Sequence, residues 1–180
     1  MSLHIPDEIC IHIMTFLGSQ DIWASLHNVN HQWRRLSEDY MINPISHRVS
    51  NGQCPIEKFS IGLKTSLGAG SHHRGYDVRG TITFSFQHFN SHNMQYAFFG
   101  APLVHPQSCT SRAMERWHQI AAKGVGPDVE WSVQFGYQGE VKDVRLWKLV
   151  VANAGSGGDA GDGVWCDWRE MLDAYFRTVV

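Results

Sequence analysis

The sequence contains no long hydrophobic run and little excess of charge of either sign. No stretch approaches the roughly 18 consecutive apolar residues that a membrane-spanning helix requires. Asp7, Glu8 and His12 interrupt the first hydrophobic residues, so we expect no signal peptide and no membrane partner. The formal net charge is only −2. A nucleic-acid partner is therefore not expected, because such partners are bound through clustered Lys and Arg.

Cysteine is scarce, and its four copies are far apart in the sequence: Cys10, Cys54, Cys109 and Cys166. They form no Cys-x-x-Cys pair, which argues against the common zinc-binding and redox motifs. Without a secretory signal, we predict four free and buried thiols in a reducing compartment, the cytoplasm or the nucleus.

Motifs for catalysis, metals and cofactors are also missing. The 11 histidines show no metal-binding spacing, and no Gly-x-Ser-x-Gly sequence is present. Residues 155–160 contain a Gly-x-Gly-x-x-Ala string, but they lack the surrounding βαβ unit of a dinucleotide site, so we interpret them as a surface loop. Calcium at Asp159 and Asp162 would lack a full ligand set. We therefore predict no catalytic residue, no metal and no cofactor.

Aromatic residues, by contrast, are abundant, with seven Trp, nine Phe and five Tyr. Large rings can build the core of a small domain, or they can line a groove that recognises a peptide, a glycan or an apolar ligand. Both interpretations remain open from the sequence. If a groove exists, our candidates for binding a target are Tyr96, Phe98, Trp117 and Trp147.

The first forty residues have helical periodicity. Pro6 suits the first turn of a helix, and the apolar residues that share one face are Ile9, Ile13, Phe16 and Leu17. Gly18 can end this helix. Beyond it, apolar residues recur at spacings of three and four from Ile22 to Tyr40, which by periodicity alone predicts one long helix. Asn28 and Asn30 are possible breaks within it.

Residues 5–40 resemble an F-box. That motif begins with Leu-Pro-x-Glu, continues with spaced Ile or Leu, and ends on Val-x-x-x-Trp followed by a basic residue. The matching segments are Ile5-Pro6-Asp7-Glu8, Ile9, Ile13, Leu17, Asp21-Ile22, Leu26 and Val29 with Trp33-Arg34. Ile5 in place of Leu, and Asn30-His31 before the Trp, are conservative departures. The resemblance implies three helices rather than two.

The resemblance also implies a function. F-box proteins bind a Skp adaptor, and through it a cullin, in SCF (Skp–cullin–F-box) ubiquitin ligases, where they present a target protein without doing chemistry themselves. The implied Skp-binding residues are Ile5, Pro6, Ile9, Ile13, Leu17, Ile22, Leu26, Val29 and Trp33. The alternative is a small-molecule-binding or enzymatic β domain that carries an F-box-like helical leader. It predicts a closed apolar cavity, whereas a receptor predicts a solid core and an exposed binding surface.

The rest of the chain has mainly strand patterning. Alternation predicts strands at 58–65 and 76–89, a hairpin over 81–99, and a second hairpin from 131–137 to 141–152. Helices are predicted over 111–123 and after Asp167, and loops at 66–75, 100–110 and 154–163.

These patterns predict an α+β chain in three parts: an F-box at 1–42, a connector at 43–56 and a β-rich recognition module at 57–180. Successive hairpins indicate an antiparallel sheet, as a sandwich or half-barrel, with one inserted and one C-terminal helix.

Overall fold

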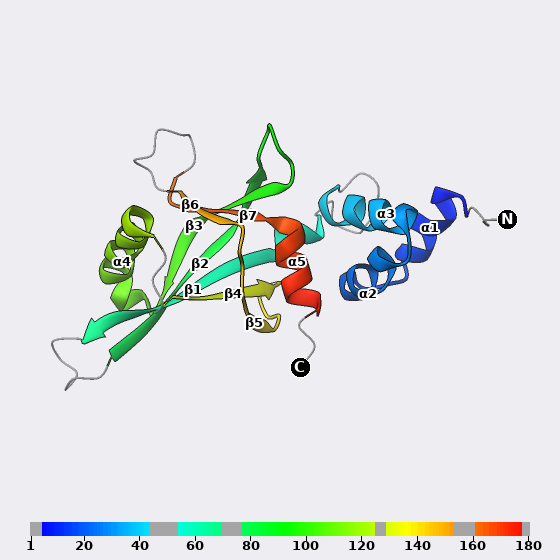
Figure 1. Ribbon diagram of the computed structural model, residues 1–180. Helices are drawn as coiled ribbons and strands as arrows, with labels where there is room; N and C mark the ends of the chain where they lie inside the picture. The colour runs from blue at the N-terminus through cyan, green and yellow to red at the C-terminus, as the bar shows by residue number, and fades with distance from the viewer. Residues whose placement is uncertain (1–4, 44–53, 70–76, 125–128, 153–160, 178–180) are drawn as a thin grey trace. The chain divides into compact units, whose positions relative to one another are not determined.

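The computed structural model describes residues 5–43, 54–69, 77–124, 129–152 and 161–177 (Figure 1). The chain divides into two compact units. The first comprises residues 1–58 and 176–180, and the second comprises residues 59–175. Most of the predicted connector, and the Gly-rich string at 155–160, lie outside the described residues.

The first unit is helical. Its elements are α1 (Asp7–Met14), α2 (Ser19–Ala24), the 3-10 turn η1 (Leu26–Asn28), α3 (His31–Ile42) and the 3-10 turn η2 (Pro55–Lys58). The long helix that periodicity alone predicted after Ile22 is wrong, and the division implied by the F-box resemblance is correct. The chain breaks because Asn30 adopts an extended conformation and caps α3 with its side chain.

A small core holds these helices together. It contains Cys10 and Met14 of α1, Ile22 and Trp23 of α2, and Trp33 and Leu36 of α3. Trp23 also stacks on His27 with ring centroids 4.2 Å apart. A module of this size buries little surface, so polar contacts between its helices matter for its geometry.

The second unit is built on an antiparallel sheet. Its strands in the described residues are β1 (Phe59–Ala69), β2 (Asp77–Phe89), β3 (Tyr96–His105), β4 (Glu130–Phe135), β5 (Val141–Val144), β6 (Leu149–Ala152) and β7 (Gly163–Asp167). Their order in the sheet is β5-β4-β1-β2-β3-β7-β6. The sheet forms a half-barrel, so the predicted α+β fold class is confirmed, together with both hairpins, β2–β3 and β4–β5.

Three details of the strand prediction are wrong. The strand predicted over 141–152 is two strands, because β5 and β6 lie at opposite edges of the sheet and residues 145–148 connect them. The strand β7 lies in a segment that had no predicted strand. In addition, β1 and β3 extend into the predicted loops at 66–75 and 100–110.

Both helices of the second unit pack on the same face of the sheet. Phe59, Ile61 and Leu63 alternate along β1 and are buried, and Ile61 is paired in register with Phe84 of β2. The helix α4 (Thr110–Lys123) packs Trp117 on Phe84, with ring centroids 4.8 Å apart. The helix α5 (Trp168–Arg177) packs Tyr175 on Phe59, at 5.4 Å. Apolar residues thus fill this face from both ends.

Helix α5 is held at its start by Asp167, the residue before it, and by Trp168, its first residue. The carboxylate of Asp167 accepts hydrogen bonds from the backbone N–H groups of Arg169 and Glu170, at 3.1 and 3.4 Å. The side chain of Trp168 donates to the carbonyl of Met94 at 2.8 Å. These contacts attach the start of the helix to the β2–β3 hairpin.

Candidate functional site

Helix α1 carries two apolar faces but buries only one. Cys10 and Met14, four residues apart, point into the helical core and are fully buried. Ile9, Ile13 and Phe16 follow the spacing of a second face, and Ile9 and Phe16 are 51% and 76% exposed. Exposed apolar side chains grouped in this way are typical of a surface that a partner covers.

The nine predicted Skp-binding residues separate into two groups by burial. Five are exposed: Ile5, Pro6, Ile9, Ile13 and Val29. Leu17 and Leu26 are half-buried. Ile22 and Trp33 are buried, so they stabilise the helices and offer little contact area of their own.

Phe16 was not among the predicted Skp-binding residues, although the sequence contains its signal. It lies seven residues after Ile9 and three after Ile13, which is the spacing of one helix face. In the structure α1 ends at Met14, and Phe16 lies in the turn that follows. Its ring also meets His12 edge-on, with centroids 5.1 Å apart.

Polar contacts hold α1 in place on α3. The Gln32 side chain donates to the Asp7 carboxylate at 2.7 Å and to the carbonyl of Ile5 at 2.6 Å. Arg35 forms an ion pair with the same carboxylate. The start of α1 is therefore held by two side chains from one turn of α3. This arrangement presents the exposed apolar face on a rigid support.

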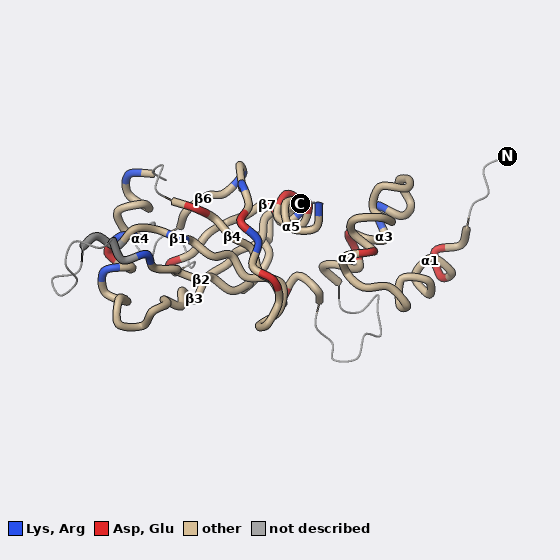
Figure 2. The backbone as a smooth tube through the Cα atoms, turned by 90° about the horizontal axis from the view of Figure 1, so that it is seen from below, with Lys and Arg blue, Asp and Glu red and all other residues tan. Residues whose placement is uncertain are grey.

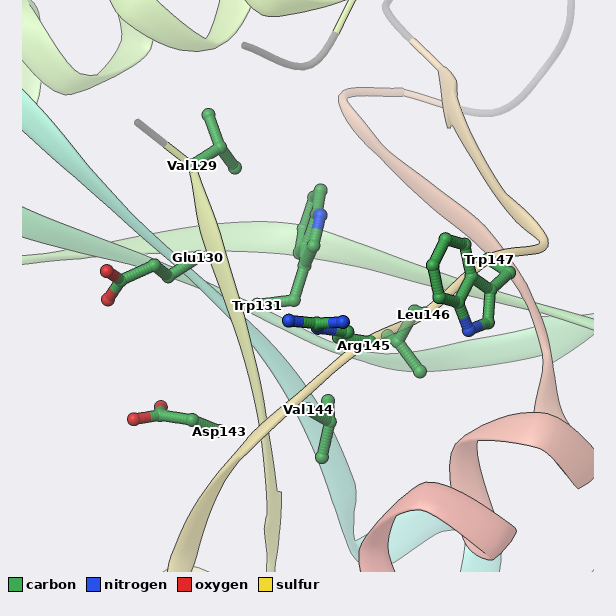
Figure 3. A pocket seen from close by; sticks show the side chains of 8 residues that line it. All are labelled: Val129, Glu130, Trp131, Asp143, Val144, Arg145, Leu146 and Trp147. Carbon is green, nitrogen blue, oxygen red and sulfur yellow. The ribbon is translucent and has the colours of Figure 1, made fainter. Parts of the chain in front are cut away.

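The second unit contains a pocket of about 580 Å³ next to β4 and β5 (Figure 3). Pairing between these strands ends at Trp131 and Val144, and the chain then leaves β4 towards the opposite edge of the sheet. The pocket lies where the two segments diverge. The residues that line it are Val129, Glu130, Trp131, Asp143, Val144, Arg145, Leu146 and Trp147.

The aromatic walls of this pocket differ in exposure. Trp131 is almost completely buried, whereas Trp147 is 79% exposed. The backbone beneath Trp147 is nevertheless fixed by α5, because the Glu170 carboxylate accepts from the N–H groups of Trp147 and Lys148 at 2.7 and 3.1 Å. The pocket is thus open to solvent and built on an anchored segment.

The structure does not bring the four predicted target-binding aromatics together. Phe98 and Trp117 are buried, and Tyr96 is half-buried on β3. Phe98 packs on Trp165 within the sheet, with ring centroids 5.0 Å apart. Only Trp147 lines the pocket, so most of the aromatic surplus is core. Arg145 was missed although it lies only two residues before Trp147 in the sequence. Trp131 was missed because only the tertiary structure places it beside this segment.

Each of the two acidic residues that line the pocket lies close to a basic residue on another strand of the sheet. The Glu130 carboxylate lies 3.8 Å from the Arg79 guanidinium, and the Asp143 carboxylate forms an ion pair with Lys64. Acidic and basic residues are also interspersed along the rest of the described backbone (Figure 2). No broad surface of one sign therefore accompanies the pocket in the described part of the chain.

Among the described residues, no group of three or more His, Cys, Asp or Glu side chains is arranged to hold a metal ion. None of the described helices combines the length and the apolar character needed to cross a bilayer.

Comparison with known proteins identifies the helical unit. The family model of the F-box-like domain matches residues 2–42. The chain therefore carries an F-box-like domain, and domains of this kind typically bind Skp-type adaptors. No curated protein and no solved structure matches the chain.

Proposed function

We propose that this chain, with its N-terminal F-box-like domain, is a substrate receptor of an SCF ubiquitin ligase. The first unit would bind a Skp adaptor, and through it a cullin, while the second unit would hold a target protein. The observation that carries the proposal is the exposed apolar surface formed by Ile9 and Ile13 of α1 and by Phe16 in the turn after it, on a domain that matches the F-box-like family. The receptor itself would supply no catalytic residue.

Burial supports docking through α1. A helix on the surface of a globular protein normally buries its apolar stripe against the core and exposes polar residues on the opposite face. Here the stripe of Cys10 and Met14 is already buried, and Ile9, Ile13 and Phe16 remain 51%, 40% and 76% exposed. A Skp groove would remove these three side chains from water. Burial stabilises such contacts by roughly 25 cal/mol for each Å² of apolar surface.

The second unit supports a receptor better than a closed ligand-binding domain. Its concave face is filled by rings from α4 and α5, and its pocket opens to solvent at Trp147. The alternative function, a small-molecule-binding or enzymatic domain, predicts a closed cavity. A solid core beside an exposed pocket favours recognition of another macromolecule.

Co-purification with a Skp protein tests the first half of the proposal. The informative variant is Ile9→Gln combined with Ile13→Gln, because both side chains are exposed and Gln is at least as good a helix former as Ile. We expect each substitution to weaken binding about tenfold, the effect of losing a contact worth about 1.4 kcal/mol. The exposed Gln20 on α2, which is outside the motif, provides a control, as Gln20→Ala.

Thermal unfolding of each variant separates lost contact from lost folding. The double variant should unfold at the wild-type temperature, whereas Trp33→Ala should lower it, because Trp33 is buried. Failure of the wild-type chain to bind Skp, or equal binding by the double variant, would refute the proposal.

A further inference from the structure

We propose that the pocket beside β4 and β5 binds an extended peptide in which an Asp or Glu side chain adjoins a large apolar residue. This inference rests on the proposed function, since it names the kind of target segment that the second unit would recognise. Three features of the pocket carry it. Arg145 has no partner among the described residues, Trp131 and Trp147 line the pocket (Figure 3), and Glu170 holds the backbone at Trp147.

The charge balance favours an anionic ligand. Of the charged residues that line the pocket, Glu130 is paired with Arg79 and Asp143 with Lys64. Both carboxylates point away from the side on which Trp131 lies (Figure 3). Arg145 is exposed and has no hydrogen bond or ion pair with any residue that the structure describes. A carboxylate from a ligand would provide that partner, in the bidentate geometry that guanidinium groups favour.

The aromatic walls favour a neighbouring apolar side chain. Arg145 and Trp131 both line the pocket, and Leu146 and Trp147 follow Arg145 along the same segment (Figure 3). A ring or a branched aliphatic group placed here would cover the exposed face of Trp147 and remove apolar surface from water. A volume of about 580 Å³ is within the range of small-ligand pockets, enough for a few side chains.

The anchoring of residues 145–148 favours recognition without reorganisation. Glu170 holds the N–H groups of Trp147 and Lys148, and the ammonium group of Lys148 lies 3.2 Å from the Asp167 carboxylate. A segment whose backbone is already held loses less conformational entropy when a ligand binds to it.

The same contacts argue against a free C-terminal carboxylate as the ligand. Chain termini are usually held by clustered backbone N–H groups. In this pocket the N–H groups of Trp147 and Lys148 are already occupied by Glu170. An internal acidic side chain, which needs only the guanidinium, therefore fits better.

Affinity selection with the full-length chain tests the inference. The probe is a library of displayed octapeptides without free C-termini. We expect enrichment of Asp or Glu next to Phe, Trp, Leu or Ile. The best peptide is then synthesised with an amidated end, and its binding is compared by fluorescence anisotropy with Gln and Lys versions. The acidic peptide should bind about tenfold more tightly than the Gln version.

Variants of the pocket complete the test. Arg145→Met should abolish the preference for the acidic peptide over the Gln version, and Trp147→Ala should weaken all binding about tenfold or more. Both residues are exposed, so folding should be unaffected. The matched controls are Arg112→Met on α4 and Tyr137→Ala, an aromatic residue that is 96% exposed.

Three results would overturn the inference: no enriched peptide, enrichment of basic peptides, or an acidic preference that survives in Arg145→Met. A requirement for a free C-terminus would overturn it as well. Skp binding by the same protein preparation keeps the two proposals apart. Loss of peptide binding with Skp binding intact rejects the pocket assignment and leaves the role of α1 standing.

Discussion

The side chain of Asn30 accepts a hydrogen bond from the backbone N–H of Trp33 at 3.0 Å. This contact starts α3 and separates it from η1, in a segment whose apolar periodicity runs without interruption from Ile22 to Tyr40. One polar side chain therefore overrides a periodic pattern. The orphan N–H groups at a helix start are stabilised by such a cap.

Replacement of this cap should destabilise the helical unit. We expect Asn30→Ala to lower the free energy of unfolding by about 1 kcal/mol. Asn30→Asp should have little effect, because Asp caps equally well and its charge suits the helix N-terminus. Urea unfolding monitored by circular dichroism measures the difference. Equal stability of the Ala and Asp variants would contradict the role of the cap.

Asp167 should make stability depend on acid pH. Burial opposes ionisation of this carboxylate, but hydrogen bonds from Gln95, Lys148 and the N–H of Glu170 outweigh it and hold its pKa below the usual value. A lowered pKa in the folded state means that the stabilisation is present above the unfolded pKa, about 3.9 for Asp. It is lost as the pH falls through the folded value.

Comparison of Asp167→Asn with the wild type checks this dependence. At pH 7 we expect Asn to lower the free energy of unfolding by about 1–2 kcal/mol, because it loses the charge-assisted hydrogen bonds. As the pH falls through the lowered pKa of the folded state, the wild-type carboxyl also loses its charge, so the difference should shrink. Urea unfolding at pH 7 and over a series of acid pH values measures it. A difference independent of pH would show that ionisation of Asp167 plays no part.

Removal of the Glu170 carboxylate should loosen the segment that carries Trp147. We expect Glu170→Ala to accelerate hydrogen exchange at the amides of Trp147 and Lys148, since both lose their acceptor. Glu115→Ala on the exposed face of α4 is the matched control and should leave these amides unchanged. Unchanged exchange in Glu170→Ala would mean that other contacts hold the segment.

The four cysteines should differ in reactivity towards thiol reagents. Burial raises the pKa of Cys54 to about 11 and also raises that of Cys166, so neither is a thiolate near neutral pH. Cys10 is fully buried as well, whereas Cys109 is half-buried. We expect one fast-reacting thiol in the native protein, lost in Cys109→Ser. More than one fast thiol in the folded protein would contradict the burial of the other three.

Two glycines near the start of β7 provide a matched pair. A Cβ atom on Gly163 would lie 2.3 Å from the carbonyl oxygen of Phe99 and 2.5 Å from the Phe98 ring. A Cβ atom on Gly161 would meet nothing within 4 Å. We expect Gly163→Ala to lower the free energy of unfolding by about 2–3 kcal/mol and Gly161→Ala to be nearly neutral. Thermal unfolding of the two variants tests whether β7 packs this tightly on β3.

Much of the fold could be predicted from local patterns. Alternation along β1 and β2 and helical periodicity in α4 are short-range signals, and the structure follows them closely. The F-box resemblance likewise implied that the segment after Gly18 is more than one helix, because the order and spacing of an entire motif contain information that periodicity lacks. It also named Ile9 and Ile13 as Skp-binding residues, and both side chains are exposed. Burial of Ile22 and Trp33 could not be predicted, since it depends on how three helices pack.

The pocket was decided by tertiary structure alone. Residues 141–152 have the pattern of one strand, yet the order of the sheet sends β5 and β6 to opposite edges and makes residues 145–148 a crossing segment. That crossing places Arg145 and Trp147 beside Trp131. The amino-acid sequence by itself determined the helical F-box-like domain and most of the strands, because those depend on neighbours in the chain. The proposed recognition surface depends on contacts between distant segments, which only the folded sheet defines.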